Sequence, residues 1–309
     1  MKIINYPKES ALLPPLAMAL GFFDGVHRGH RELIARTVDA ARERGLASAV
    51  FTFPADSVGL KSGTLRLYNT EQKLALLESL GVEYVILADF ASVTSLTPDE
   101  FVSEVIIGAL GCRLAASGSA FRFGKGASGD SDCLLRLMRE AGCDALVIDE
   151  LLLDGIPLST TRIRAALGRG ECAEAANMLG IPYRISARVQ HGLGLGHSFG
   201  FPTVNTALPE GSPLRRGVYA TKVKIGEKVY TGVTNVGVCP TVREREEHCE
   251  TLLVDFGESI YGERITLYFL DYLRDERTFP SVEDLRKQIA LDTERAIKAG
   301  VEYNGRKLD

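Results

Sequence analysis

Over its first 150 residues the chain alternates short apolar runs with stretches that carry apolar residues at helical spacing, and this alternation constrains the fold more than any other feature. The apolar runs are as short as strands buried on both faces and cover residues 16–23, 47–53, 84–88, 113–117 and 145–148. After the first run, the helical rhythm is carried by Leu33, Ile34, Thr37, Val38 and Ala41. Strand and helix in succession predict an α/β domain with a doubly wound parallel sheet, whose ligands bind at the carboxyl ends of the strands.

Two helix starts in this half can be read from their capping residues. Thr97-Pro98-Asp99-Glu100 combines an N-cap, a proline at the first helical position and a capping-box glutamate. Asn69 precedes a helix predicted over Glu71–Leu80, and Gly81 ends that helix.

The rhythm changes after Tyr183, where strand-like runs follow one another without helices between them. These runs cover residues 184–190, 217–225, 228–234, 250–256 and 264–271, and they predict a small antiparallel barrel or sandwich. A final helix is predicted over 281–298, and it carries Leu285, Ile289 and Ile297 along one face. Two short helices, 161–167 and 173–179, form a connector, so we predict domains over 1–158 and 183–309 joined by residues 159–182.

Composition narrows the class of protein. A formal net charge of −4 over 309 residues gives no electrostatic reason to expect nucleic acid or an anionic membrane as a partner. Six cysteines without CxxC or zinc-type spacing predict reduced thiols in a cytoplasmic protein. No apolar run reaches the roughly 20 residues that span a bilayer. Pro14 and Pro15 interrupt an N-terminal stretch that otherwise imitates a signal peptide. We expect small molecules as partners, and nothing in the sequence supports oligomerisation.

The loop from Gly21 to His30, Gly-Phe-Phe-Asp-Gly-Val-His-Arg-Gly-His, joins the first apolar run to the first helix. A helix N-terminus offers unpaired N–H groups and the positive end of the helix dipole, which suit a phosphate. His27 and His30 stand three residues apart in the first turn, so both can face a ligand there. The alternative is a pair of ordinary surface or metal-binding histidines.

Two later segments of the first half add cationic and aromatic groups. The basic, aromatic and glycine-rich segment Phe121-Arg122-Phe123-Gly124-Lys125-Gly126 follows a strand and is expected to form a lip over an aromatic or phosphorylated ligand. The segment 159–164, Ser-Thr-Thr-Arg-Ile-Arg, places hydroxyls at a helix start and Arg162 and Arg164 in its first turn, which predicts a second anion site. A plain N-cap with solvated arginines is the alternative for this segment.

A glycine-rich stretch opens the second half, from Gln190 to Asn205. Its glycines do not fit the GxGxxG spacing, and a proline at 202 follows where a helix should begin, so a dinucleotide-binding oxidoreductase is a poor interpretation. A glycine loop over phosphates leading into a strand fits better. That strand carries Thr203 and Asn205, whose oxygens suit a Mg²⁺ ion bridging nucleotide phosphates.

These motifs together resemble the bacterial bifunctional FAD synthetases, which are riboflavin kinase/FMN adenylyltransferases. The resemblance rests on the loop at 21–30, the FRFG segment, the STTRIR helix, Phe201-Pro202-Thr203-Val204-Asn205 and the segments 250–256 and 273–279, and it covers nearly the whole chain. It implies a Rossmann-like, HxGH-type α/β nucleotidyltransferase domain followed by a small antiparallel β-barrel riboflavin kinase domain with a C-terminal helix. The implied substrates are ATP with Mg²⁺, riboflavin and FMN, with FAD as the final product.

The resemblance also implies roles for individual residues. His27 and His30 would steady the ATP phosphates during adenylyl transfer, and Arg164 would hold the same phosphates. Glu250 would be the general base that accepts the proton of the riboflavin 5′-hydroxyl. The remaining residues implied in nucleotide or phosphate binding are Gly21, Phe22, Asp24, Gly25, Gly29, Ser159, Thr160, Arg162, Gly196 and Thr203.

The chain departs from the family pattern at several positions. The usual Pro-His-Pro after the second strand reads Pro54-Ala55-Asp56, and Ala120 stands where the family has Asn or Asp before the FRFG segment. The usual Ser-Ser-Thr is Ser-Thr-Thr at 159–161. In the second half, His197 and Cys239 stand where the family has arginine. Two alternatives therefore stay open: a riboflavin kinase whose first domain serves as a scaffold or binding module, and a flavin-binding protein without turnover.

Overall fold

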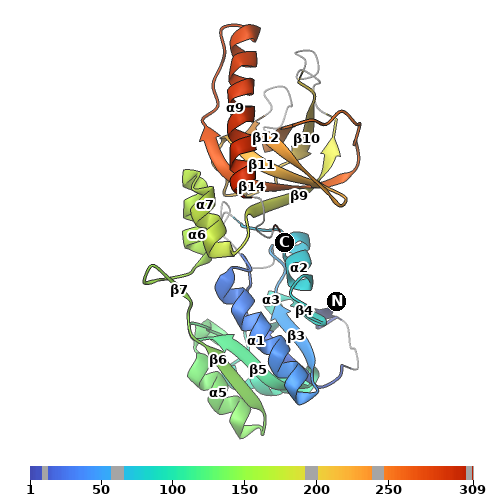
Figure 1. Cartoon of the computed structure of the whole chain (residues 1–309). Coiled ribbons are helices and arrows are strands. Elements are labelled where there is room, and N and C mark those ends of the chain that lie inside the picture. The colour runs from blue at the N-terminus through green and yellow to red at the C-terminus, as the bar shows by residue number, and fades with distance from the viewer. Residues whose placement is uncertain (9–12, 57–65, 192–200, 239–246, 304–307, 309) are drawn as a thin grey trace. The chain divides into compact units, whose positions relative to one another are not determined.

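A computed structural model describes residues 1–8, 13–56, 66–191, 201–238, 247–303 and 308 (Figure 1). The chain divides into two compact units, each described here by itself. Unit 1 comprises Met1–Thr64 and Tyr68–Thr160, and unit 2 comprises Leu65–Leu67 and Thr161–Asp309. The helical connector is thus grouped with the second unit.

Unit 1 is built on a six-stranded parallel sheet of order β1-β4-β3-β2-β5-β6. Its strands are β1 (Lys2–Tyr6), β2 (Leu16–Leu20), β3 (Ala47–Thr52), β4 (Tyr84–Ala88), β5 (Cys112–Gly118) and β6 (Asp144–Ile148). The predicted doubly wound sheet is confirmed. The sequence order reverses at β2, between β3 and β5, and in such sheets ligands bind at the switch point.

Helices cover both faces of this sheet. α1 (Arg28–Arg44) packs on β2, β3 and β5, and α5 (Ser131–Glu140) packs on β5 and β6. The other helices of the unit are α2 (Thr70–Glu78), α3 (Phe90–Val93), α4 (Pro98–Glu100), η1 (Phe101–Ala109) and η2 (Lys125–Ala127). Leu16, Met18 and Leu20 lie in one core cluster with the apolar side chains of η1 and α5. Because strand side chains alternate, Ala17 and Ala19 face the opposite side, toward α1.

Both predicted N-caps are confirmed, whereas α2 ends at Glu78, two residues before the predicted Leu80. Asn69 and Thr97 each form a capping box at the start of a helix. The helix that Thr97 starts continues as a π-helix, η1, which the sequence did not indicate. The sequence also missed β1, a mostly exposed edge strand, and the small hairpin β7 (Leu152–Leu153) and β8 (Ile156–Pro157).

Unit 2 contains a closed barrel of six antiparallel strands in the order β10-β13-β12-β11-β14-β9 (Figure 1). The strands are β9 (Tyr183–Gln190), β10 (Thr203–Ala207), β11 (Gly217–Ile225), β12 (Lys228–Val238), β13 (Glu247–Leu253) and β14 (Arg264–Arg274). The prediction left barrel and sandwich open, and the pairing of β9 with both β10 and β14 closes the barrel.

The prediction that a strand opens at Glu250 and runs to Phe256 was wrong. β13 begins three residues earlier, so Glu250 lies in mid-strand, and it ends at Leu253 because the chain turns at Val254 and Asp255. Asp255 has a φ of 55°, which a continuing strand excludes.

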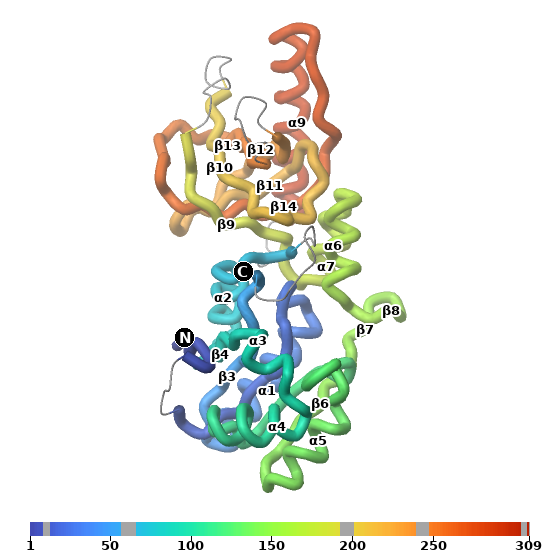
Figure 2. Tube along the Cα trace, turned by 180° about the vertical axis from the view of Figure 1, so that it is seen from behind, coloured from blue at the N-terminus to red at the C-terminus, as the bar shows by residue number. Residues whose placement is uncertain are grey.

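The described residues of unit 2 form three helices besides the barrel. α6 (Thr160–Arg169) and α7 (Cys172–Leu179) form the connector, and α7 lies against β9 and β14. α9 (Val282–Glu302) packs along β11, β12 and β14, as Figure 2 shows from behind. α9 buries Asp292, Ala296 and Gly300, and Ile297 of the predicted apolar face is exposed. In the described part of the chain, no helix combines the length and the apolar character needed to cross a bilayer.

Candidate active sites

In unit 1 the two histidines of the loop stack on each other at the start of α1. His27 is the N-cap of the helix, and its Nδ1 accepts a hydrogen bond of 3.3 Å from the backbone N–H of His30. The two rings lie 3.7 Å apart at 15°. Because Nδ1 of His27 accepts, a neutral His27 carries its proton on Nε2.

Burial keeps both imidazoles neutral near pH 7. Only 7% of His27 is exposed, and burial lowers its pKa to about 4. Burial also lowers the pKa of His30 well below its usual range. Repulsion from the protonated form of His27 and from the Lys73 ammonium lowers it further. The pair therefore offers phosphate oxygens neutral N–H donors.

Backbone strain and close contacts hold the histidine loop in place. Phe23 and Val26 have φ values of 50° and 42°, which are uncommon for non-glycine residues and mark functional loops. A Cβ on Gly21 would lie 2.9 Å from the Phe23 ring, and one on Gly29 would lie 3.3 Å from the His27 ring. A side chain at Gly21 would thus collide with the Phe23 ring, and one at Gly29 would crowd the His27 ring.

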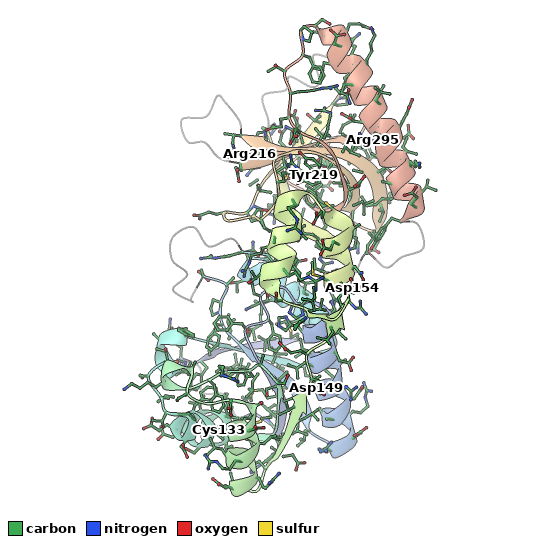
Figure 3. All side chains as sticks on the ribbon, turned by 90° about the vertical axis from the view of Figure 1, so that its left-hand side faces the viewer. Cys133, Asp149, Asp154, Arg216, Tyr219 and Arg295 are labelled. Carbon is green, nitrogen blue, oxygen red and sulfur yellow. The ribbon has the colours of Figure 1, made fainter. Side chains whose placement is uncertain are left out.

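A cavity of about 310–330 Å³ opens in each unit, and the one in unit 1, of about 330 Å³, lies at the histidine loop. The predicted residues that line it are Gly21, Phe22, His27, Gly29 and His30. Phe121 and Arg122 of the expected lip also line it, as does Ala120, the residue before the lip. Asp24 and Gly25 belong to the loop but do not line this cavity. The sequence missed Asp149 and Glu150, which follow the carboxyl end of β6; Figure 3 labels Asp149. The position after a buried strand was the signal that could have found them.

Two residues that depart from the family pattern, Ala120 and Ala55, differ in their position relative to the cavity. Ala120 is exposed and lines the cavity, where a methyl group forms no hydrogen bond. Ala55 lies outside the lining, and its backbone N–H donates to Thr70 Oγ1 at 2.9 Å. Of the two positions, Ala120 is therefore the one where a polar side chain would face the cavity.

The segment of the second predicted anion site falls at the boundary of the two units. Ser159 precedes α6, Thr160 begins it, and Arg162 and Arg164 lie on it within unit 2. Arg162 Nη2 lies 3.8 Å from Glu174 Oε1 of α7. The binding of ATP phosphates by Arg162 and Arg164 stays a prediction.

The buried histidines predict a loss of stability in acid. The folded pKa of each lies below the ordinary value of 6.5, so the unfolded chain binds more protons between about pH 4 and 6.5. Stability is complete above pH 6.5 and falls as the pH drops through this window, by about 3 kcal/mol for His27 alone. Urea unfolding at pH 7 and at pH 4.5, compared with His27→Gln, measures this. An equal acid sensitivity in the variant would contradict the assignment.

In unit 2 the register of the barrel sets three polar side chains in a row. Asn205 of β10 pairs with Glu250 of β13, and Glu250 pairs in turn with Asn235 of β12. Directly paired residues point to the same face of a sheet. Thr203, two residues from Asn205, donates from Oγ1 to Glu250 Oε1 at 2.7 Å. The sheet thus brings together the three predicted residues Thr203, Asn205 and Glu250.

Buried threonines fix this register from inside the barrel. The hydroxyl groups of Thr221 and Thr234 lie 2.9 Å apart, and those of Thr234 and Thr251 lie 3.0 Å apart. All three side chains are almost fully buried. Tyr219, labelled in Figure 3, is also buried and donates from its hydroxyl to the carbonyl of Arg215.

The second cavity, of about 310 Å³, lies between the barrel and α9 and contains Thr203 and Glu250. Its walls are mostly apolar, with Phe201, Val218, Val233, Leu252, Phe279, Leu285 and Ile289. Four charged residues besides Glu250 also line it: Arg274, Glu276, Arg277 and Asp292. A carboxylate beside an apolar slot suits a flat ligand that presents a hydroxyl group.

An ion pair joins α9 to the barrel at this cavity. The Arg274 guanidinium donates from Nε to Asp292 Oδ2 at 2.9 Å, and Gln288 Nε2 donates to Asp292 Oδ1 at 2.7 Å. Asn235 Nδ2 donates to Glu276 Oε1 at 3.0 Å. The sequence missed Asn235 and Asp292, which lie among β-like and helical residues without a motif of their own.

Several predicted positions lie outside the described residues, namely Gly196, His197 and Cys239. Within the described part of the chain, no group of three or more His, Cys, Asp or Glu side chains is arranged to hold a metal ion. Thr203, Asn205 and Glu250 form a set of hard oxygen donors instead, which is the kind Mg²⁺ takes beside nucleotide phosphates.

A doubly wound sheet with a cavity at its histidine loop and a closed barrel with a cavity at Glu250 define the class: a protein of two units, each with one candidate site. The chain matches the family described as FAD synthetase over residues 10–162 and the family described as riboflavin kinase over residues 179–299. The bifunctional riboflavin kinase/FMN adenylyltransferase of Escherichia coli (strain K12) is 35% identical over 93% of this chain and 91% of its own length. The enzyme of that name from Bacillus subtilis (strain 168) is 35% identical over 91% of each chain. This chain belongs to the bifunctional riboflavin kinase/FMN adenylyltransferase family.

A solved structure shares the fold along the whole chain. It is named as a macrolide-efflux protein from Streptococcus pneumoniae, with 29% identity and a TM-score of 0.85, and it covers 96% of this chain and 99% of its own. The activity in that name is said of that protein alone, and the likeness shows the fold.

Proposed function

We propose that this chain uses ATP to phosphorylate riboflavin to FMN in unit 2 and joins FMN to the AMP part of a second ATP in unit 1, giving FAD and pyrophosphate. The hydrogen bond between Thr203 and Glu250 in the lining of a mostly apolar cavity carries the kinase part of the proposal. Family membership over nearly the whole chain supports both steps.

In the kinase step the 5′-hydroxyl of riboflavin attacks the γ-phosphorus of ATP. Glu250 accepts the hydroxyl proton, the bond from the γ-phosphorus to the bridging oxygen breaks, and ADP leaves. Thr203 orients the carboxylate, and the apolar walls hold the flavin ring and exclude water.

Mg²⁺ would be held by Thr203 and Asn205. The Thr203 hydroxyl donates its proton to Glu250, so its oxygen lone pairs remain available to a cation. The ion would neutralise charge on the transferring phosphates.

In the adenylyl-transfer step the FMN phosphate attacks the α-phosphorus of ATP, and pyrophosphate leaves. Nothing must be deprotonated, so catalysis rests on positioning and on stabilising the charge of the leaving group. His27 and His30 would donate neutral N–H groups to these phosphates. Arg164, with Ser159 and Thr160, would add a guanidinium and two hydroxyl groups.

An incubation with riboflavin, ATP and Mg²⁺, beside a tube fed FMN, tests both steps. The amounts of riboflavin, FMN and FAD are measured over time by chromatography. We expect FMN and then FAD in the first tube, and FAD in the second. FMN without FAD in either tube would leave a riboflavin kinase with an inactive first domain.

Ala120→Asn tests whether the missing polar side chain at position 120 limits adenylyl transfer in unit 1. We expect it to raise FAD formation from FMN about tenfold, because an amide restores a hydrogen-bonding group to the cavity wall, and roughly 1.4 kcal/mol corresponds to tenfold. The rate of riboflavin phosphorylation serves as the internal control, since it belongs to the other unit. An unchanged or lower adenylylation rate would show that Ala120 does not face the reacting groups.

A further inference from the structure

Among the described residues of unit 1, the lysine at position 73 is buried, and it has no role in the kinase or adenylyl-transfer steps proposed for this chain. Lys73 lies on α2, and only 2% of it is exposed. A buried ammonium group loses its hydration, so it is retained only where protein oxygens replace the water.

Lys73 finds three such oxygens. Its Nζ donates to the carbonyl of Phe22 at 2.9 Å, to Thr52 Oγ1 at 3.1 Å and to the carbonyl of Phe53 at 2.6 Å. Thr52 in turn donates from Oγ1 to the same Phe22 carbonyl at 2.9 Å. All three donor positions of the ammonium are thus used.

These acceptors lie where two neighbouring strands end. Phe22 follows β2 in the histidine loop, and Phe53 follows β3, which pairs with β2 in the sheet. Lys73 therefore joins the two loops that leave the carboxyl edge beside the cavity. Phe22 itself lines that cavity, and its ring lies 5.0 Å from the Phe53 ring.

The charge of Lys73 also acts on the site. It is close enough to His30 to lower the pKa of that imidazole, and Asp24 of the histidine loop favours the protonated lysine. Burial lowers the pKa of Lys73 to about 8, so the ammonium is still charged at pH 7. A fixed positive charge near His30 attracts a polyphosphate without competing for its oxygens.

We propose that Lys73 is a positioning residue of adenylyl transfer, which ties the loops after β2 and β3 together and supplies a buried positive charge beneath the triphosphate of ATP. The proposal rests on the proposed function of unit 1. It does not make Lys73 a group that touches the substrate, because the side chain is buried behind the loop.

Lys73→Met tests the role, because it keeps the length of the side chain and removes the charge and all three hydrogen bonds. We expect FAD formation from FMN to fall about 100-fold, mainly in kcat, while riboflavin phosphorylation stays within twofold. Thr52→Val is the matched control, since it removes one partner of the ammonium and leaves both carbonyls; we expect a fall of less than tenfold. Adenylylation by Lys73→Met within threefold of the unchanged chain overturns the proposal.

Lys73→Ala covers the case in which the methionine variant does not fold. It leaves a hole the size of propylammonium, so we expect n-propylammonium to restore adenylylation and n-propanol of the same size not to restore it. Restoration by both, or by neither, overturns the proposal because the charge would then have no role.

A measurement without turnover separates this proposal from the proposed function. If the unchanged chain makes no FAD, side-chain NMR of its five histidines, assigned with His27→Gln and His30→Gln, reports on the site directly. We expect α,β-methylene-ATP with Mg²⁺ to shift the His27 and His30 signals, and to need at least tenfold higher concentration in Lys73→Met. The same concentration dependence in both proteins overturns the role of Lys73.

Discussion

Glu250→Gln is expected to lower FMN formation by a factor of about 10² to 10⁴, which is the contribution of a general base. Glutamine keeps an oxygen that can accept the hydrogen bond from Thr203, so the shape of the cavity is conserved. It cannot accept the proton of the riboflavin hydroxyl. Riboflavin affinity, followed by the quenching of flavin fluorescence, is expected to change less than threefold. Initial rates at saturating riboflavin and ATP measure the loss in kcat.

Glu247→Gln is the matched control for this variant. It removes a carboxylate from the same strand, but Glu247 lies outside the cavity and pairs with Arg216. We expect it to keep the full kinase rate. Full kinase activity in Glu250→Gln would refute the base assignment, whereas loss of FMN formation with retained riboflavin binding excludes a flavin-binding protein without turnover.

Much of the fold could be predicted from local pattern. The inner strands β2, β3 and β4 of the parallel sheet are covered on both faces, so they stand out as continuous apolar runs. β1 escaped prediction because it lies at the edge of the sheet with mostly exposed side chains. Closure of the barrel depends on the pairing of β9 with β10 and β14, which a periodicity of two along each strand does not encode.

The candidate sites also combine local motifs with features that depend on tertiary structure. The histidine loop and the Thr203–Asn205 segment are local motifs, so the sequence alone was enough to single them out. The hydrogen bond from Thr203 to Glu250 joins residues 47 positions apart and depends on the register of β10 and β13. Lys73 was missed because its burial depends on tertiary packing, and a lysine in an amphipathic helix ordinarily faces solvent.

Asp292→Ala is expected to destabilise unit 2 by about 3–5 kcal/mol, the usual cost of leaving one partner of a buried ion pair without the other. Asp292 is fully buried, and its two oxygens accept from Arg274 and Gln288. The variant leaves the Arg274 guanidinium, which is 18% exposed, beside an apolar cavity without its carboxylate. A fall in Tm on the order of 10 °C is expected for a unit of this size. Calorimetry measures it.

Two further variants test whether the effect comes from the buried charge. Glu283→Ala, on the same helix, breaks a 3.9 Å contact with Lys287 that is largely exposed, and surface pairs of this kind contribute roughly 0–1 kcal/mol. Arg274→Met with Asp292→Leu replaces both charges by apolar groups, and such pairs are often as stable as the ion pair. We expect the double variant to recover most of the Tm but not the affinity for riboflavin, because Arg274 lines the cavity of unit 2 in which we propose that riboflavin binds. An unchanged Tm in Asp292→Ala would mean that α9 is held to the barrel by its apolar contacts alone.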